Sequence, residues 1–173
     1  MKTIYIYSFG KDNQWVFLTN MSTPRVLHGA VSVTDGIWVS GGQQSENSTE
    51  FIYLNGSRSD GPKLSAPAWG HCVVQHEGIV FSIGGANPIT NSNYKTVSIY
   101  SAHEGMKYIA DGPSMNKGRN NHACGIFKSN VHNGHPVIVV AGGSPQQDVG
   151  QSCEYLDFTV PNAKWEMCSK SLF

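Results

Sequence analysis

The sequence is poor in charge. Charged residues make up 14% of its 173 residues, and twelve Lys and Arg balance twelve Asp and Glu. A protein that binds a phosphate backbone or an anionic membrane surface normally carries a basic excess, which this chain lacks. Its longest apolar run, Val137 to Ala141, is also far shorter than the roughly 18 residues of a membrane-spanning helix. We therefore predict no nucleic-acid partner and no membrane partner.

Cysteine is scarce as well. The four cysteines form no C-x-x-C pair and are too few for a disulfide scaffold. Cys153 and Cys168 flank an expected hairpin almost symmetrically, so they are either a cross-strand disulfide or two half-buried thiols. Three N-glycosylation sequons begin at Asn20, Asn47 and Asn55, a number close to chance in a chain rich in Asn, Ser and Thr. The compartment stays open, with the cytoplasm slightly favoured over an extracellular location.

Glycine, by contrast, is abundant and regularly placed. Three apolar runs end in a glycine pair, and the pairs recur 43 and then 58 residues apart: Ile37–Gly42, Ile79–Gly85 and Val137–Gly143. A histidine precedes the second glycine of each pair by 14, 14 and 21 residues: His28, His71 and His122. The repeat unit is therefore longer than the glycine pair, and the uneven spacing indicates insertions in loops.

Each unit contains further short runs after its glycine pair. One run ends near an aromatic or acidic residue, at Tyr53, Tyr100 and Phe158, and another precedes the next unit. The sequence thus predicts four short strands in each unit of about 45–50 residues, which is typical of a propeller blade.

These residues resemble kelch repeats. The resemblance rests on the glycine pair, on an acid and an aromatic as in Glu50-Phe51-Ile52-Tyr53 and Glu154-Tyr155, and on Asn162-Ala163-Lys164-Trp165. It implies an all-β fold, a partial kelch-type β-propeller of about three and a half four-stranded blades. The expected parts are the last two strands of one blade in residues 1–24 and complete blades in 25–67, 68–118 and 119–173. We expect a fragment of a longer chain, and self-association through the open propeller edges.

The glycine pairs and the histidines suggest two kinds of site that we do not favour. A phosphate loop needs a helix after its glycines, whereas Gln43, Ala86 and Ser144 begin polar loops. The three repeated histidines are either metal ligands around a central channel or, as we prefer, packing elements. We accordingly predict no metal and no cofactor.

The loops of a propeller offer a more suitable binding surface. In kelch-like domains the connectors between blades converge with the loops that follow the glycine pairs, which gives a composite rim. We predict that a protein or peptide binds there through these residues: Arg25, Trp69 and Arg119 on the connectors, and Gln43, Gln44, Asn87, Asn91 and Gln146 on the loops. The two arginines would suit an acidic peptide if they are free, and the alternative is that they brace neighbouring blades through loop carbonyls.

The expected function is therefore that of a protein-interaction module. The resemblance implies a ubiquitin-ligase substrate adaptor or an actin-associated scaffold. We predict that the chain is not an enzyme, because no nucleophile with a base, carboxylate pair or metal constellation recurs at a usable spacing. The alternative is a fragment of an extracellular kelch-like enzyme of the oxidase type, or a carbohydrate-binding module.

Overall fold

The fold consists of strands arranged in sheets that follow one another along the chain. The computed structural model describes residues 2–8, 13–129, 134–144 and 147–169. Within these ranges lie fourteen strands and one four-residue helix. The strands are β1 (Thr3–Tyr7), β2 (Trp15–Asn20), β3 (Gly29–Val33), β4 (Gly36–Ser40), β5 (Thr49–Tyr53), β6 (Arg58–Asp60), β7 (Cys72–His76), β8 (Ile79–Ile83), β9 (Val97–Ser101), β10 (Lys107–Asp111), β11 (Ala123–Lys128), β12 (Pro136–Ala141), β13 (Cys153–Leu156) and β14 (Glu166–Met167), and the helix is α1 (Gln147–Gly150).

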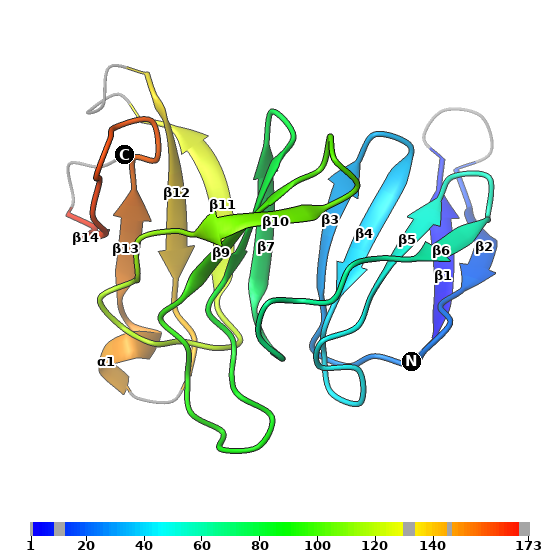
Figure 1. The fold of residues 1–173 in the computed structure, drawn as a ribbon, viewed down its shortest axis with the longest axis horizontal. Helices are drawn as coiled ribbons and strands as arrows, with labels where there is room; N and C mark the ends of the chain where they lie inside the picture. Colours follow the sequence, from blue (N-terminus) through cyan, green and yellow to red (C-terminus); the bar gives the residue numbers. More distant parts are fainter. Residues whose placement is uncertain (1, 9–12, 130–133, 145–146, 170–173) are drawn as a thin grey trace.

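The strands form four antiparallel sheets. A half-blade contains β1 and β2, the first blade β3 to β6, the second blade β7 to β10, and the third blade β11 to β14, each in chain order. The inner strands of neighbouring blades lie side by side, β3 against β7 and β7 against β11, and the sheets fan out from them (Figure 1). This is the expected all-β partial propeller of about three and a half blades. Nowhere in the described ranges does a helix have the length and apolar character needed to span a membrane.

Burial along each blade explains the pattern of its strands. The second strands carry continuous apolar runs, because their side chains pack against a neighbouring blade or against other side chains of their own sheet. In β12, Val137 to Val140 are all buried, whereas all five residues of the outer strand β10 are exposed. The outer strands β6 and β14 are short, whereas β2 and β10 expose apolar side chains such as Trp15 and Ile109.

The hydrophobic core lies between the blades. Met21, Val39 and Ile52 fill the interface between the half-blade and the first blade. The next two interfaces are filled by larger sets: Trp38, Leu64, Val73, Val80, Tyr100 and Met106, and then Phe81, Ile83, Val97, Met115, Ile138, Val140, Leu156 and Trp165.

The glycine pairs make room for the histidines at these interfaces. A Cβ on Gly41 would lie 2.9 Å from Cε1 of His71, and a Cβ on Gly84 would lie 2.9 Å from Cε1 of His122. The same positions have φ angles of +57° and +63°, which favour glycine. Each of these two histidines thus fits against the first glycine of the preceding blade. This close fit explains why histidine and glycine pair recur together, and it gives His71 and His122 a packing role.

Two disulfides connect the strands. Cys153 and Cys168 bridge β13 to the residue after β14, with a Cα–Cα distance of 5.3 Å, as one of the two sequence alternatives has it. Cys72 and Cys124 join β7 to β11, the inner strands of adjacent blades, with a Cα–Cα distance of 6.0 Å. The sequence analysis did not find this second bridge. All four cysteines of the chain lie in the described ranges, and all four are paired.

Candidate functional site

The connectors and the loops after the glycine pairs meet at one end of the blades. We call this surface the loop rim, and its described residues comprise connectors 21–28, 61–71 and 112–122 and loops 41–48, 84–96, 142–144 and 147–152, at the lower edge of Figure 1. Short antiparallel bridges join each connector to the loop of its own blade: Val26 to Gln43, Trp69 to Ala86, and Asn120 to Ser144.

Backbone hydrogen bonds also join the rim across neighbouring blades. The second glycine of the first two pairs donates to the connector of the following blade, Gly42 N to Ala68 O at 3.0 Å and Gly85 N to Arg119 O at 2.9 Å. The loops of the first and second blades are therefore held in place by backbone contacts on two sides. A surface ordered in this way loses less conformational entropy when it binds a partner.

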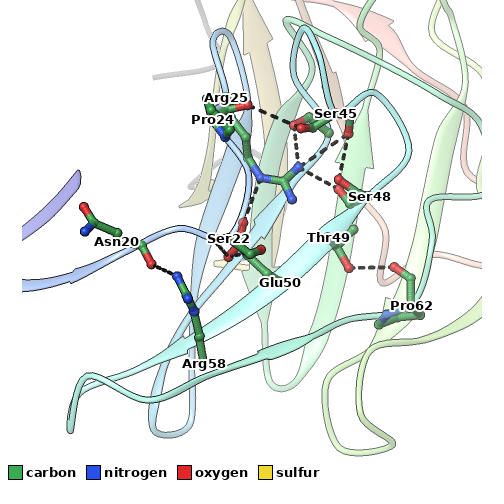
Figure 2. Close-up of polar contacts among 11 residues, drawn as sticks. Asn20, Ser22, Pro24, Arg25, Ser45, Ser48, Thr49, Glu50, Arg58 and Pro62 are labelled. Carbon is green, nitrogen blue, oxygen red and sulfur yellow. Dashed lines mark hydrogen bonds and ion pairs between the residues drawn. The ribbon is translucent and has the colours of Figure 1, made fainter. Parts of the chain in front are cut away.

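A buried ion pair braces the rim in the first blade. Arg25 Nε lies 3.1 Å from Glu50 Oε1, and the two side chains are each 1% exposed (Figure 2). Arg25 Nη1 donates to the carbonyls of Gly41 and Ser48, both at 2.9 Å. Glu50 Oε2 accepts from Ser22 N at 2.8 Å and from Ser22 Oγ at 2.9 Å, so the pair ties connector, loop and sheet together.

The electrostatics of Glu50 follow from these contacts. Burial alone would raise the pKa of this carboxyl. The hydrogen bonds from Ser22, together with the Arg25 guanidinium, outweigh burial and hold the pKa of Glu50 below its ordinary value. The carboxylate is thus kept ionised inside the protein by groups that are themselves part of the rim.

The third blade repeats the arrangement. Arg119 Nη2 lies 2.7 Å from Glu154 Oε1, and both side chains are fully buried. Arg119 Nη1 donates to Gly142 O at 2.7 Å, which matches the bond from Arg25 to Gly41. Glu154 accepts from the backbone nitrogens of Asn116 at 2.7 Å and Lys117 at 3.1 Å.

The second blade replaces both charges. The position three residues before the repeat histidine is Arg25, Ala68 and Arg119 in the three blades, and the position of the acid is Glu50, Ser98 and Glu154. In the other two blades the glutamate carboxylate contacts the connector. In the second blade Ser98 takes this position, and its Oγ lies 2.9 Å from Oγ of Ser65 on the connector. The sequence analysis grouped Trp69 with the arginines, but the equivalent residue is Ala68.

The structure corrects the expectation that the arginines contact a partner. Arg25 is 2% exposed and Arg119 is fully buried. A guanidinium that is enclosed and already bonded to a carboxylate and to loop carbonyls has no donor left at the surface for an acidic peptide. The geometry supports the bracing alternative for both residues.

The other predicted contact residues lie on the rim itself. Gln43, Gln44 and Asn91 are exposed, and Trp69 is half-buried. Asn87 is half-buried and its Oδ1 accepts from Ile89 N at 2.8 Å and Thr90 N at 3.0 Å, so it shapes its own loop. The prediction for Gln146 falls outside the described residues.

One prominent rim residue was missed by the sequence analysis. Ile89 lies on the loop of the second blade and is 89% exposed. Neighbouring side chains fix this loop, because Asn93 Nδ2 donates to Ser144 O at 3.0 Å and Tyr94 Oη donates to Pro67 O at 3.2 Å. The turn residues around it, Asn87-Pro88-Ile89-Thr90-Asn91, were the available signal for an ordered loop with an apolar tip.

A second concave surface lies between the second and third blades. It has a volume of about 640 Å³ and is mainly apolar, with Phe81, Ile99, Leu156 and Phe158 in its walls and His76 beside them. In the preceding interface, Trp38 and Tyr100 lie with ring centroids 5.6 Å apart. Phe81 and Leu156 occupy the equivalent strand positions with smaller side chains, which leaves the space open.

Comparison with known proteins supports the architecture. YjhT, a protein of known structure, superposes with a TM-score of 0.72 at 15% sequence identity, over 93% of this chain and 57% of the YjhT chain. The fold is that of a kelch-type β-propeller. Kelch-like protein 40a of Danio rerio is 28% identical over 81 residues, which is 43% of this chain and 13% of that protein. This chain therefore corresponds to a small part of that relative, and no family model matches it.

The comparison corrects one prediction. The absence of a recurring catalytic constellation led us to predict that the chain is not an enzyme. YjhT shares this fold at 15% sequence identity, and the fold by itself does not exclude an enzymatic role. The prediction was wrong because a fold does not determine function, and the lack of a recurring set of residues does not exclude a catalytic set that occurs once.

Proposed function

We propose that the chain is a kelch-type protein-interaction module that binds a protein or peptide partner through the loop rim. The observation that carries this proposal is the ordered rim, whose connectors and loops are fixed by bridges within and between blades. The rim exposes four side chains of this set, the amides of Gln43, Gln44 and Asn91 and the apolar side chain of Ile89. An apolar residue surrounded by adaptable polar groups is a common arrangement in protein interfaces.

The chemistry of the rim points to a partner segment with little charge. Its two arginines are buried in ion pairs with Glu50 and Glu154. Those predicted contact residues that are exposed have amide side chains. Lys63 and Lys95 are exposed elsewhere on the rim, but Gln43, Gln44, Ile89 and Asn91 carry no charge, so a partner carboxylate opposite these four residues would face neutral groups. We therefore propose a partner with a small apolar pocket for Ile89 and hydrogen-bonding groups for the amides around it.

The paired cysteines bear on the more specific roles. Disulfides persist in oxidising compartments and are rare in the cytosol. All four cysteines are bonded, which favours an interaction outside the cytosol over the ubiquitin-ligase adaptor and actin-scaffold roles. The same observation supports the second candidate, an extracellular carbohydrate-binding or catalytic module of the kelch type.

Site-specific photo-crosslinking tests the rim proposal. A photoreactive amino acid is placed singly at Gln43 or Ile89 on the rim, and at Leu54 or Glu104 in turns at the opposite end as matched exposed controls. The protein is irradiated in extract or fluid from its source, and crosslinked proteins are identified by mass spectrometry. We expect one shared protein at both rim positions and not at the controls. Equal crosslinking from both ends, or from the controls alone, would overturn the proposal.

We also propose self-association through the half-blade. Tyr5, Trp15 and Phe17 are 52%, 69% and 53% exposed, and they form two cross-strand aromatic pairs with their neighbours. Exposed aromatic surface of this kind favours association. Sedimentation velocity over a range of concentrations should show a dimer or larger species, and Trp15→Ser with Phe17→Ser should shift it to monomer. A wild-type chain that stays monomeric throughout would contradict this.

A further inference from the structure

The three sequons occupy different structural settings. Asn55 lies in the turn between β5 and β6, at the end of the blade opposite the loop rim (Figure 1). Asn55 and Ser57 are both exposed, and Gly56 between them has a φ of +84°. Ser57 N and Ser57 Oγ donate to Asn55 Oδ1 at 2.9 and 2.6 Å. The acceptor asparagine and the sequon hydroxyl are thus in direct contact on an open turn.

The other two sequons are built into the rim. Thr49, the hydroxyl residue of the Asn47 sequon, is 3% exposed and donates to Pro62 O at 2.6 Å. The carbonyl of Asn47 accepts from Leu64 N at 2.9 Å, which fixes the loop against a connector. Ser22, in the Asn20 sequon, donates its hydroxyl to the buried Glu50 carboxylate (Figure 2). In both, the hydroxyl serves the fold and does not reach the asparagine amide.

The disulfides give an independent reason to consider glycosylation. N-glycosylation occurs in the oxidising secretory route, where disulfides also form. The Cys72–Cys124 disulfide joins two blades across a sequence separation of 52 residues, so its formation during folding requires an oxidising environment. In a chain that forms its disulfides in the secretory route, an exposed sequon can also receive a glycan.

We propose that Asn55 carries an N-linked glycan. In the step that attaches it, a bond forms between Asn55 Nδ2 and the anomeric carbon of an oligosaccharide supplied by a lipid-diphosphate carrier. The bond from that carbon to the carrier phosphate breaks, one amide proton leaves, and no atom changes its oxidation state. The glycan extends from the end opposite the loop rim, beside Leu54, so it leaves Gln43 and Ile89 accessible to a partner, and the Leu54 and Glu104 crosslinking controls are made in an Asn55→Gln background so that no glycan covers them.

Mass spectrometry of the native protein tests this. Enzymatic removal of N-glycans in heavy-oxygen water converts a glycosylated asparagine to labelled aspartate. Because the Asn55-Gly56 step can also deamidate spontaneously in this water, we expect the label at Asn55 in most molecules with the enzyme and not in a sample incubated without it, and no thiol available to an alkylating reagent before reduction. A label only at Asn20 or Asn47, an unlabelled Asn55, or four freely alkylated thiols would each overturn the proposal.

Variants of the full chain, expressed behind a secretion leader in eukaryotic cells, sharpen the test. Asn55→Gln and Ser57→Ala should each remove the glycan-dependent shift in gel mobility, and Ser57→Thr should retain it. Asn20→Gln and Asn47→Gln are the matched controls and should leave the Asn55 glycan in place. Retention of the shift in Asn55→Gln would contradict the assignment. Crosslinking from the rim should be unchanged in Asn55→Gln, so failure of the glycan proposal is distinguishable from failure of the rim proposal.

Discussion

The second blade differs from the first and third in the way it holds its part of the loop rim. The first and third blades each enclose an arginine and a glutamate, whereas the second places Ala68 and Ser98 at the same positions. The backbone bonds of the rim are nevertheless equivalent, as shown by Gly42 N to Ala68 O and Gly85 N to Arg119 O. Rim geometry is therefore set by the backbone, and the charge pair is an addition to it.

The difference also shows that the two charges depend on one another. Burying an isolated charge is costly, so an enclosed arginine without its glutamate, or the reverse, destabilises the fold. The second blade lacks both charged residues at these positions and has serine hydroxyls there instead, with Ser98 bonded to Ser65 and to Asp111. The arginines at the repeated rim position therefore stabilise the rim in this chain, although arginine is a residue type that is common in ligand-binding surfaces.

The largest effect is expected from breaking one charge pair. Arg119→Ala leaves the Glu154 carboxylate buried without its partner and should lower the free energy of unfolding by about 3–5 kcal/mol. Urea denaturation measures this. Lys107→Ala removes a solvent-exposed ion pair with Glu104 and serves as control, with an expected loss of about 0–1 kcal/mol. Similar losses for the two variants would contradict the bracing role.

The next effect concerns the bridge between the two kinds of blade. Cys72→Ser with Cys124→Ser releases the second blade from the third and opens a loop of 52 residues. A loss of about 4 kcal/mol is expected on the chain-entropy estimate, compared with about 3 kcal/mol for the Cys153–Cys168 bridge and its 15 residues. Thermal and urea unfolding of the two double variants compares them. The reverse order would show that unfolded-chain entropy does not govern these bridges.

A feature shared by both kinds of blade predicts the response to acid. Burial lowers the pKa of His71, in the second blade, and of His122, in the third, from 6.5 to about 4. The unfolded chain therefore binds protons between these values while the folded chain does not. The contribution of these two histidines to the free energy of unfolding is fully present above pH 6.5 and is lost as the pH drops toward 4. Between pH 6.5 and 5 each histidine should account for about 2 kcal/mol.

Histidine variants test this assignment. His71→Gln and His122→Gln should each reduce the slope of unfolding free energy against pH in that window. An unchanged slope in both buried variants would show that other groups cause the acid response.

The smallest effect is expected in the second blade. Ser98→Ala removes the hydrogen bond with Ser65 at 2.9 Å and the longer one to Asp111 Oδ1 at 3.3 Å, and should cost about 1–2 kcal/mol. Replacement of Glu154 by alanine at the equivalent position should cost several times more, because it strands Arg119. Equal losses on urea unfolding would show that the two kinds of blade are held in the same way.

The sequence predicted the blades more completely than the site. Glycine pairs, recurring histidines and short apolar runs act through local periodicity, so the propeller and its strands could be inferred from spacing alone. The burial of Arg25 and Arg119 depends on Glu50 and Glu154, which lie 25 and 35 residues further along the chain. Nothing local in the sequence reveals such a pairing, and the Cys72–Cys124 bridge was missed for the same reason. The blade boundaries near residues 24, 67 and 118 stay a prediction.

Converting the third blade to the composition of the second is the most direct test of the brace. Arg119→Ala and Glu154→Ser are compared singly and together by urea unfolding. Each single change should strand a buried charge, and the double variant should be more stable than Arg119→Ala alone, because neither charge then remains. Losses that simply add in the double variant would contradict the account.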